Sequence, residues 1–239
     1  MPPPQKIRCV VASTVNHGEG VFSVELTPER RAPRHRPGQF LHLALDAYEP
    51  GGFWPESRAF SIASGPARDR LRITYAVHGA FTTRMAKELM PGRQVWVKMP
   101  YGEFAVAGDG EVVLCAGGTG ITAFTAFLEQ MVSVPRATRV VVAYAARTSK
   151  LLVYRPLIDE LAEGGRVTAL YFVEDASDTP GAADAIPGRF ALEPVWSRLN
   201  RPQAALYFLA GPPAMLSSVE EELRARHVPP ESIRTDAWE

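Results

Sequence analysis

A glycine-spaced segment, Gly118-x-Gly120-x-x-Ala123, has the residue types that a phosphate-binding loop requires. Glycines let the backbone turn tightly and approach a pyrophosphate closely, and the N-terminus of a following helix offers unpaired N–H groups and a partial positive charge. The largely apolar run at residues 111–117 predicts a buried strand before the segment, and apolar residues at helical spacing follow it. This context favours a dinucleotide site. The alternative is an ordinary strand-to-helix turn that happens to need glycine.

A second segment, Arg58-Ala59-Phe60-Ser61, places a cation, an aromatic ring and a hydroxyl within four residues of a predicted strand. On a strand, Arg58 and Phe60 share one face while Ala59 and Ser61 share the other. An arginine can pair with phosphate, and a phenylalanine offers a flat stacking surface. Taken alone, the segment is more typical of an ordinary amphipathic strand without any ligand.

A third segment, residues 78–89, predicts a short helix that Gly79 and Thr82 open. We expect the Thr82 hydroxyl to cap this helix, because threonine side chains accept hydrogen bonds from the first N–H groups of a helix. The start of the helix is a second candidate anion site.

The bulk composition excludes several classes of protein. The chain has 239 residues, 46% of them hydrophobic, with Lys+Arg equal to Asp+Glu at 26 each. Its net charge is therefore zero, and it has no overall positive electrostatic potential to attract nucleic acid or an anionic membrane. No apolar run is long enough to cross a bilayer, and the first residues lack the apolar core of a signal peptide, so we expect a cytoplasmic protein.

The cysteines and histidines suggest no metal centre. Cys9 and Cys115 are the two cysteines, and each lies in an apolar, strand-like run that predicts a reduced core residue. Two thiols cannot form a four-cysteine iron–sulfur site or a cysteine-only zinc site. The five histidines form no recognisable ligand cluster.

Secondary-structure patterning divides the chain into two predicted domains. Residues 1–106 read as strands, turns and one helix, which favours a small antiparallel β-barrel. Residues 107–239 alternate strands with helices, as expected of a Rossmann-like parallel α/β domain whose ligand lies beyond the carboxyl ends of its strands. Strands are predicted at 7–12, 21–26, 40–45, 58–64, 71–77 and 94–98, then at 111–117, 138–145, 166–173 and 204–210, with helices at 151–161 and 214–227 and a polar loop at 174–188.

Taken in order, these segments resemble the ferredoxin–NADP reductase superfamily over essentially the whole chain. Arg58-Ala-Phe-Ser61 is similar to that family's flavin-binding motif, and Gly79-Ala-Phe-Thr82 to its motif at the FAD pyrophosphate. The segment at residues 100–104 resembles the end of the flavin barrel. Residues 116–122 resemble the pyridine-nucleotide phosphate loop, Gly211-Pro212-Pro213-x-Met215 the second nucleotide motif, and Asp236-Ala-Trp238 the acid–x–aromatic near the C-terminus.

The resemblance implies FAD as cofactor and NAD(P)H as electron donor. Arg58 would pair with flavin phosphate, Phe60 would stack on the isoalloxazine, and Ser61 would hydrogen-bond near its reactive nitrogen. Thr122 and Gly211 would admit the nicotinamide ring, which makes Ser61 and Thr122 the residues implied to act in catalysis. The further cofactor-binding residues that it implies are Ala59, Tyr75, Val77, Gly79, Phe81, Thr82, Thr83, Gly117, Gly118, Thr119, Gly120, Arg147, Pro212 and Trp238.

Two positions leave alternatives open. Many family members carry cysteine where this chain has Ala210, and flavin reductases that use free flavin also lack that cysteine. Residues 147–150, after the second strand of the α/β half, contain Arg147 and no acid, which favours the 2′-phosphate of NADPH. Relatives that use NADH carry similar segments, so Arg147 would then contact adenine or solvent.

We therefore expect an FAD-dependent reductase that takes hydride from NAD(P)H and passes electrons to a separate acceptor, such as a ferredoxin or flavodoxin, an oxygenase component or ferric iron. One alternative is an NAD(P)H:flavin oxidoreductase with free flavin as substrate. Another is a non-catalytic flavin-dependent redox sensor or regulatory subunit. A basic run at residues 30–36 could dock an acidic partner, although a solvated loop is the commoner explanation.

Overall fold

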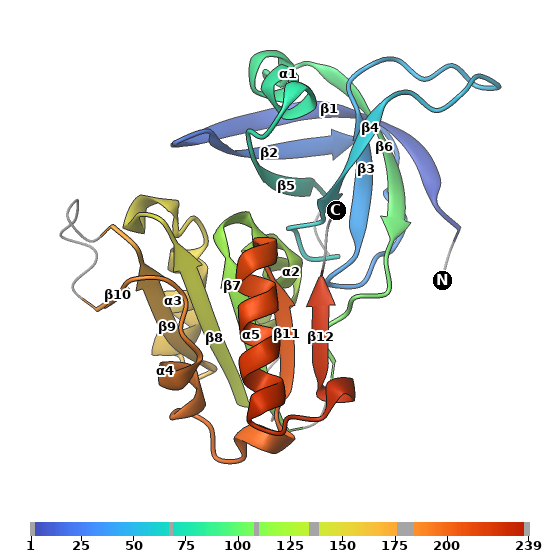
Figure 1. Cartoon of the computed structure of the whole chain (residues 1–239). Helices are drawn as coiled ribbons and strands as arrows, with labels where there is room; N and C mark the ends of the chain where they lie inside the picture. The colour runs from blue at the N-terminus through green and yellow to red at the C-terminus, as the bar shows by residue number, and fades with distance from the viewer. Residues whose placement is uncertain (1–2, 67–68, 108–109, 134–138, 176–183, 237–239) are drawn as a thin grey trace. The chain divides into compact units, whose positions relative to one another are not determined.

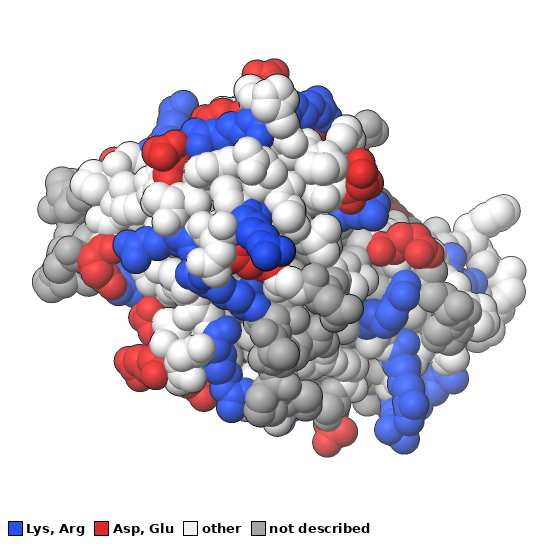
Figure 2. Space-filling view, turned by 90° about the horizontal axis from the view of Figure 1, so that it is seen from below, with Lys and Arg blue, Asp and Glu red and all other residues white. Residues whose placement is uncertain are grey.

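The computed structural model describes residues 3–66, 69–107, 110–133, 139–175 and 184–236. They fall into two compact units, residues 1–105 and residues 106–239, each built on one six-stranded sheet. No helix in the described part of the chain is long and apolar enough to span a membrane. Acidic and basic side chains both appear on the face drawn in Figure 2, as expected from their equal numbers.

The first unit is a nearly closed antiparallel barrel, as predicted (Figure 1). Its sheet has the strand order β4-β3-β6-β1-β2-β5. Alternate residues point inward along each strand, so that Leu71, Ile73 and Tyr75 of one strand are buried in a single apolar core. The elements are β1 (Gln5–Gly18), β2 (Val21–Pro28), β3 (Phe40–Ala44), β4 (Ser57–Ser61), β5 (Leu71–Ala76), α1 (Ala80–Glu88) and β6 (Gln94–Tyr101).

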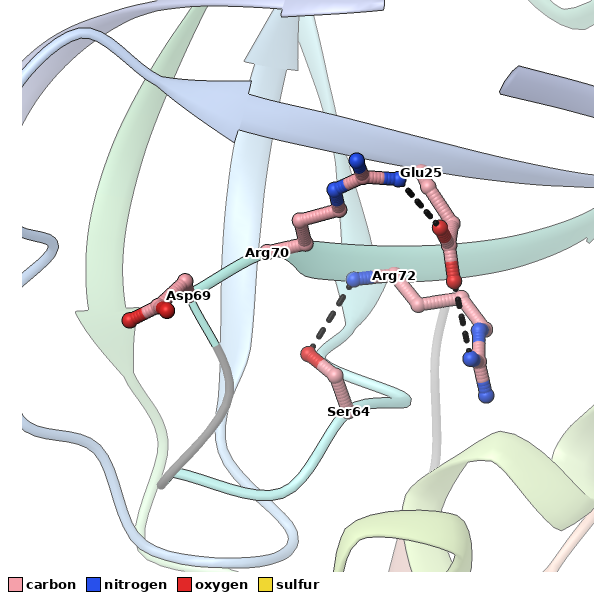
Figure 3. A pocket seen from close by; sticks show the side chains of 5 residues that line it. All are labelled: Glu25, Ser64, Asp69, Arg70 and Arg72. Carbon is pink, nitrogen blue, oxygen red and sulfur yellow. Dashed lines mark hydrogen bonds and ion pairs between the residues drawn. The ribbon is translucent and has the colours of Figure 1, made fainter. Parts of the chain in front are cut away.

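The barrel closes through a small polar cluster between its two edge strands, β4 and β5. The Ala63 N–H donates to the Arg72 carbonyl at 2.8 Å, and the Arg72 N–H donates to Ser64 Oγ at 3.1 Å. Glu25 of β2 accepts hydrogen bonds from Arg72 at 2.9 Å and from Arg70 at 3.3 Å (Figure 3). With Asp69, these side chains line a pocket of about 240 Å³. Backbone contact between β4 and β5 is thus made at one end, and the rest of the seam has no strand ladder among the described residues.

The second unit is a parallel α/β sheet, also as predicted. Its strand order is β10-β9-β8-β7-β11-β12, and every neighbouring pair is parallel. The chain moves outward in one direction from β7 and in the other from β11, so the order reverses between these two strands. The elements are β7 (Glu111–Gly117), α2 (Thr122–Ser133), β8 (Arg139–Ala146), α3 (Arg155–Glu163), β9 (Val167–Val173), β10 (Ile186–Pro187), α4 (Leu192–Trp196), β11 (Leu206–Ala210), α5 (Pro213–Ala225) and β12 (Ile233–Asp236).

Helices cover this sheet and explain why its strands are apolar on both faces. Leu192 of α4 and Leu216 and Leu223 of α5 join Cys115 and Phe172 of the sheet in one buried cluster. In Figure 1, α5 crosses the sheet on the side toward the viewer. Strand β7 is buried from Val112 to Gly117, as expected of a central parallel strand.

Both cysteines are free and buried, as predicted, and burial raises the pKa of the Cys9 thiol to about 12.

Local structure departs from the predictions at several element ends. Strand β1 continues to Gly18, past the turn expected from residue 16, because it stays paired with β2 as far as the Gly18–Val21 pair. Helix α3 starts at Arg155, not at Leu151, because a 3₁₀ turn occupies residues 149–151 and Pro156 fits the first turn of the helix. Strands β10 and β12 and helix α4 were not predicted.

The barrel closure gives a pH-dependent prediction for Glu25→Gln. The hydrogen bonds from Arg72 and Arg70 lower the pKa of Glu25 below its ordinary 4.5, so its ionised form stabilises the fold above that pH and the contribution is lost as the pH falls below it. We expect the variant to lose about 1 kcal/mol of unfolding free energy near neutral pH, and the difference from wild type to shrink toward about pH 3.

Urea unfolding across that range measures both effects. Glu222→Gln is the matched control, since its carboxylate lies 3.9 Å from Arg226 on an exposed helix face; its stability should stay within about 0.5 kcal/mol of wild type. A Glu25 variant as stable as wild type at neutral pH would show that the closure does not depend on this carboxylate.

Candidate functional site

The glycine-spaced segment lies where sequence placed it, between strand β7 and helix α2. The chain leaves β7 at Gly117, makes one 3₁₀ turn over Gly118–Ile121 and enters α2 at Thr122. Gly118 has a φ of 53°, which glycine adopts without strain. The Thr122 hydroxyl donates to the Thr119 carbonyl at 2.8 Å and so holds the turn closed. The first N–H groups of α2 therefore point beyond the carboxyl end of β7, as an anion site requires.

A second loop, at the end of β11, packs directly against this turn. A side chain on Gly120 would place its Cβ 2.3 Å from the Ala210 carbonyl oxygen. A Cβ on Gly117 would lie 2.7 Å from both Pro212 Cδ and Met215 Sδ, and one on Gly211 would lie 3.0 Å from the Gly117 nitrogen. Close approach of backbone atoms thus requires Gly120, the side chains of Pro212 and Met215 leave no room for a side chain on Gly117, and a side chain on Gly211 would crowd Gly117. These contacts lie where the strand order reverses and where open α/β sheets bind their ligands.

The remaining positions at this edge also follow from the strand register. Ala210 is the last residue of β11, 1% exposed, and pairs with Asp236 of β12. Arg147 follows β8, whose Ala145 pairs with Gly117, so it lies at the same edge of the sheet. Its side chain is exposed, and its carbonyl accepts the Asp175 N–H at 2.8 Å. Trp238, predicted to bind cofactor, lies outside the described residues.

In the barrel, the predicted flavin residues gather along the open seam between β4 and β5. Phe60 of β4 meets Tyr75 of β5 edge-on, with ring centroids 6.0 Å apart. Ser61 is 8% exposed and pairs with Phe40 of β3. Ala59 pairs with His42 in the same register, and the N–H of Val77 donates to Gly20 at 2.8 Å. Unpaired backbone groups along two strand edges can bind a flat, polar-edged ring.

The phosphate-binding candidates lie beside the start of helix α1. The Arg58 guanidinium sits 5.1 Å from the centre of the Phe81 ring and forms an ion pair with Glu56 at 2.9 Å. Gly79 is the N-cap, with φ 91° and ψ −178°, a conformation that favours glycine. A Cβ there would meet nothing within 4 Å among the described atoms, so the helix start is open.

Thr82 does not cap α1 in the manner predicted. Gly79 occupies the N-cap position, and the Thr82 hydroxyl, inside the first turn, accepts the His78 N–H at 2.6 Å. Thr83 Oγ1 donates to the Gly79 carbonyl at 2.8 Å. Both threonines therefore fix the loop that enters the helix, and they leave the N–H groups of its first turn available for an anion.

Tyr75 shows that these residues fit a further polar ligand. Its side chain is 3% exposed, and its hydroxyl is the buried side-chain polar atom without a hydrogen-bond partner in the described part of the chain. Buried hydroxyls are nearly always paired, so such an atom calls for an explanation. Burial also raises the pKa of Tyr75 to about 12, which keeps the phenol neutral and able to donate.

Sequence reasoning missed one neighbour of this site. Phe22 of β2 stacks on Tyr75, with centroids 5.7 Å apart and ring planes 19° from parallel. The two residues pair across β2 and β5, a register that only the folded sheet reveals. Among the described residues, no group of three or more histidine, cysteine or acidic side chains could hold a metal ion.

Comparison with known proteins agrees with this geometry. Residues 114–221 match the family described as oxidoreductase NAD-binding domain. The flavohem-like FAD/NAD-binding domain of a nitric oxide dioxygenase from Vibrio cholerae has the same fold, with a TM-score of 0.82 at 21% identity over 97% of this chain and 98% of that one. The match to the NAD-binding family covers the second unit, and the solved structure shows that both units together have the fold of an FAD/NAD-binding domain.

Two curated relatives are components of oxygenase systems. The propane 2-monooxygenase reductase component of Rhodococcus jostii is 28% identical over 248 residues, covering 99% of this chain and 64% of the relative. The ferredoxin reductase component of a 3-ketosteroid-9-alpha-monooxygenase from Mycolicibacterium smegmatis is 27% identical, covering 96% of this chain and 63% of the relative. The chain thus spans less than two thirds of the length of these relatives.

The close approach of the two loops predicts a severe effect of Gly120→Ala. A methyl group 2.3 Å from the Ala210 carbonyl must push the loops apart, at a cost of about 1–3 kcal/mol. We expect NAD(P)H binding, measured by fluorescence titration, to weaken at least about tenfold, a change of about 1.4 kcal/mol.

Gly164→Ala is the matched control. Gly164 lies at the end of helix α3, and a Cβ there would come no closer than 3.4 Å to its described neighbours. It should bind the nucleotide as wild type does. Unchanged NAD(P)H binding by the Gly120 variant would mean that the nucleotide does not use this edge of the sheet.

Proposed function

We propose that the chain is an FAD-dependent reductase that accepts a hydride from NAD(P)H and passes electrons to a separate acceptor, foremost an oxygenase component. The observation that carries the proposal is the packing of Gly117 and Gly120 against Gly211 where the strand order of the parallel sheet reverses. Glycines at these positions let the backbone approach a pyrophosphate closely, at the edge where such sheets bind dinucleotides. The names of the oxygenase reductase relatives support the choice of acceptor.

The barrel residues would hold FAD. Arg58 and the start of α1, with Thr82 and Thr83 fixing its entry, suit the negative charge of the pyrophosphate. Phe60 offers a ring face along the open seam, and Ser61 offers a hydroxyl on the opposite face of β4. Flavin, when bound, supplies the chemistry that accepts two electrons as hydride and releases them singly.

The second unit would bind and orient the nucleotide. The turn from Gly117 to Thr122 presents N–H groups to the phosphates, and Thr122 holds the turn by its bond to Thr119. Gly211, which lacks a side chain, and Ala210, whose side chain is small, leave room beside the nicotinamide. These 239 residues contain two cysteines, both buried, which are too few for a four-cysteine iron–sulfur cluster, so an acceptor outside these residues would take the electrons.

An absorption spectrum of the purified, dialysed protein tests this function. We expect a retained flavin spectrum that bleaches when NADPH is added without oxygen, and electron transfer to an artificial one-electron acceptor. Protein that stays colourless after FAD loading and oxidises no NAD(P)H with any acceptor would refute the proposal. Bound flavin with negligible turnover would instead identify a redox sensor.

Ala210 favours a second candidate function, reduction of free flavin. Reductases that treat flavin as a substrate also lack a cysteine at this position, and Ala210 is buried at the nucleotide edge. A colourless dialysed protein that oxidises NAD(P)H only when free flavin is added would establish this second candidate. A retained flavin would exclude it.

Arg147 sets the expected nucleotide preference, NADPH over NADH. The Arg147→Gln variant should lower kcat/KM for NADPH about tenfold, the loss of one charged phosphate contact of about 1.4 kcal/mol. It should change kcat/KM for NADH by less than about twofold. Steady-state kinetics with both nucleotides measure this ratio.

Arg201→Gln is the control for net charge, because Arg201 is exposed and precedes β11, at the opposite edge of the same sheet. The Arg201 variant should leave kcat/KM unchanged for both NADPH and NADH. A strong NADH preference in wild type, or equal losses for both nucleotides in the Arg147 variant, would defeat the assignment of Arg147 to the 2′-phosphate.

A further inference from the structure

The loop between β3 and β4, residues 45–56, carries an aromatic side chain that the fold does not use. In Figure 1 this loop, drawn in light blue, extends away from the barrel. Phe53 lies on it after Gly51 and Gly52 and is 100% exposed, while Met90, the next most exposed large apolar residue of the described part of the chain, is 60% exposed. One exposed ring is not unusual, but this ring stands beside others that are only half-buried.

Three half-buried rings and a lysine lie together at the base of the loop. Tyr48 contacts both Trp54 and Trp96, with ring centroids 5.6 and 5.4 Å apart. Lys6 Nζ lies 4.0 Å from the centre of the Tyr48 ring and donates to its hydroxyl at 2.7 Å. Tyrosine and tryptophan combine an apolar ring with one polar group, and such side chains favour the boundary between water and lipid.

The outer face of β1, β6 and β3 adds positive charge beside these rings. Lys6 pairs with Lys98 across β1 and β6, and Lys98 pairs with His42 of β3, so three basic residues form one cross-strand row. Arg30 joins the row, since it donates to the Lys6 carbonyl at 3.1 Å. Lys6, Lys98 and Arg30 form no ion pair with a carboxylate in the described part of the chain. Because like charges placed opposite one another oppose folding, the row suits an anionic surface outside the chain.

The other charges of the chain do not cancel this attraction. The net charge of the whole chain is zero, but in salt solution a surface responds to charges within about 10 Å of it. On the loop, Glu56 is paired with Arg58 at 2.9 Å, which leaves the exposed Glu49 as the opposing carboxylate. An acidic protein would attract the same cations. However, a fully exposed ring on a projecting loop suits insertion into a soft apolar phase better than a packed protein interface, where the strongest contacts lie in enclosed pockets.

We infer that a lysine–aromatic patch binds the surface of an anionic lipid bilayer, with the Phe53 ring among the acyl chains and the cations at the headgroups. The patch consists of Lys6, Tyr48, Phe53, Trp54, Trp96 and Lys98. It combines apolar insertion with charge attraction, two signals that together give reversible binding to a membrane surface. The inference is independent of the proposed function, because it involves neither flavin nor nucleotide.

Sedimentation of the full chain with lipid vesicles tests the inference. Wild type should bind vesicles of phosphatidylserine and phosphatidylcholine in equal amounts, and high salt should weaken this binding. Phe53→Ser should bind them at least about tenfold more weakly, because the inserted ring is lost. The double variant Lys6→Gln, Lys98→Gln should also lose at least about tenfold, and Glu49→Gln should bind more tightly than wild type.

Matched controls lie outside the patch. Val15→Ser removes an exposed apolar side chain, 51% exposed, from the other end of β1. The double variant Arg198→Gln, Arg201→Gln removes two positive charges from exposed positions of the second unit. Both controls should bind the vesicles as wild type does. The urea midpoint of each Phe53 and lysine variant should match that of wild type, since these side chains are not in the core.

Two results would overturn the inference. Wild type that does not sediment with the phosphatidylserine vesicles does not bind an anionic bilayer, and the patch would then be left for an acidic protein. Phe53 and lysine variants that bind the vesicles as tightly as wild type would show that the patch is not the lipid-binding surface. Flavin content and NAD(P)H oxidation are measured separately, so neither result bears on the proposed function.

Discussion

The contact between the turn at Gly118–Ile121 and the end of β11 is the constraint on which the second unit depends. Gly120 lies against the Ala210 carbonyl so closely that no side chain fits, and Gly117 lies against Pro212 and Met215 in the same way. This contact holds the carboxyl ends of β7 and β11 together while the chain departs to opposite sides of the sheet. Helices α2 and α5 both begin at this edge, at Thr122 and Pro213, so their positive ends converge there. Close packing thus creates an edge that is suited to bind an anion.

In the first unit, the candidate site lies where the barrel is not fully closed, between the edge strands β4 and β5. Its six strands close at one end only, through the bonds of Ala63 and Ser64 with Arg72 and the bridge from Arg72 to Glu25. Along the rest of the seam, β4 and β5 keep unpaired edges, which in most proteins would be covered or charged. Here the seam carries Phe60 and Tyr75, and α1 begins just after β5. An edge of this kind is tolerable when a ligand covers it.

The sequence predicted what depends on residues close together in the chain. The strand, glycine turn and helix around Gly118 were predicted correctly because each signal is local. The register that stacks Phe22 on Tyr75 and the packing of Gly211 on Gly117 join distant segments, and no local pattern specifies them. The predicted cap was wrong for a local reason, since a glycine with φ 91° took the N-cap position from Thr82. Short elements such as β10, α4 and β12 lack a long enough period to detect.

The residues that look unfavourable in isolation are the ones that best indicate function. Glycines cost conformational entropy on folding, and the unpaired Tyr75 hydroxyl costs the hydration it loses. Natural folds satisfy such groups almost everywhere, so exceptions concentrate where a ligand completes the structure. Gly79 and Gly118 lie at two helix starts that remain open, and Tyr75 borders the seam of the barrel. Where unsatisfied groups coincide with motif residues, a ligand that satisfies them would bind the folded chain and thereby stabilise it.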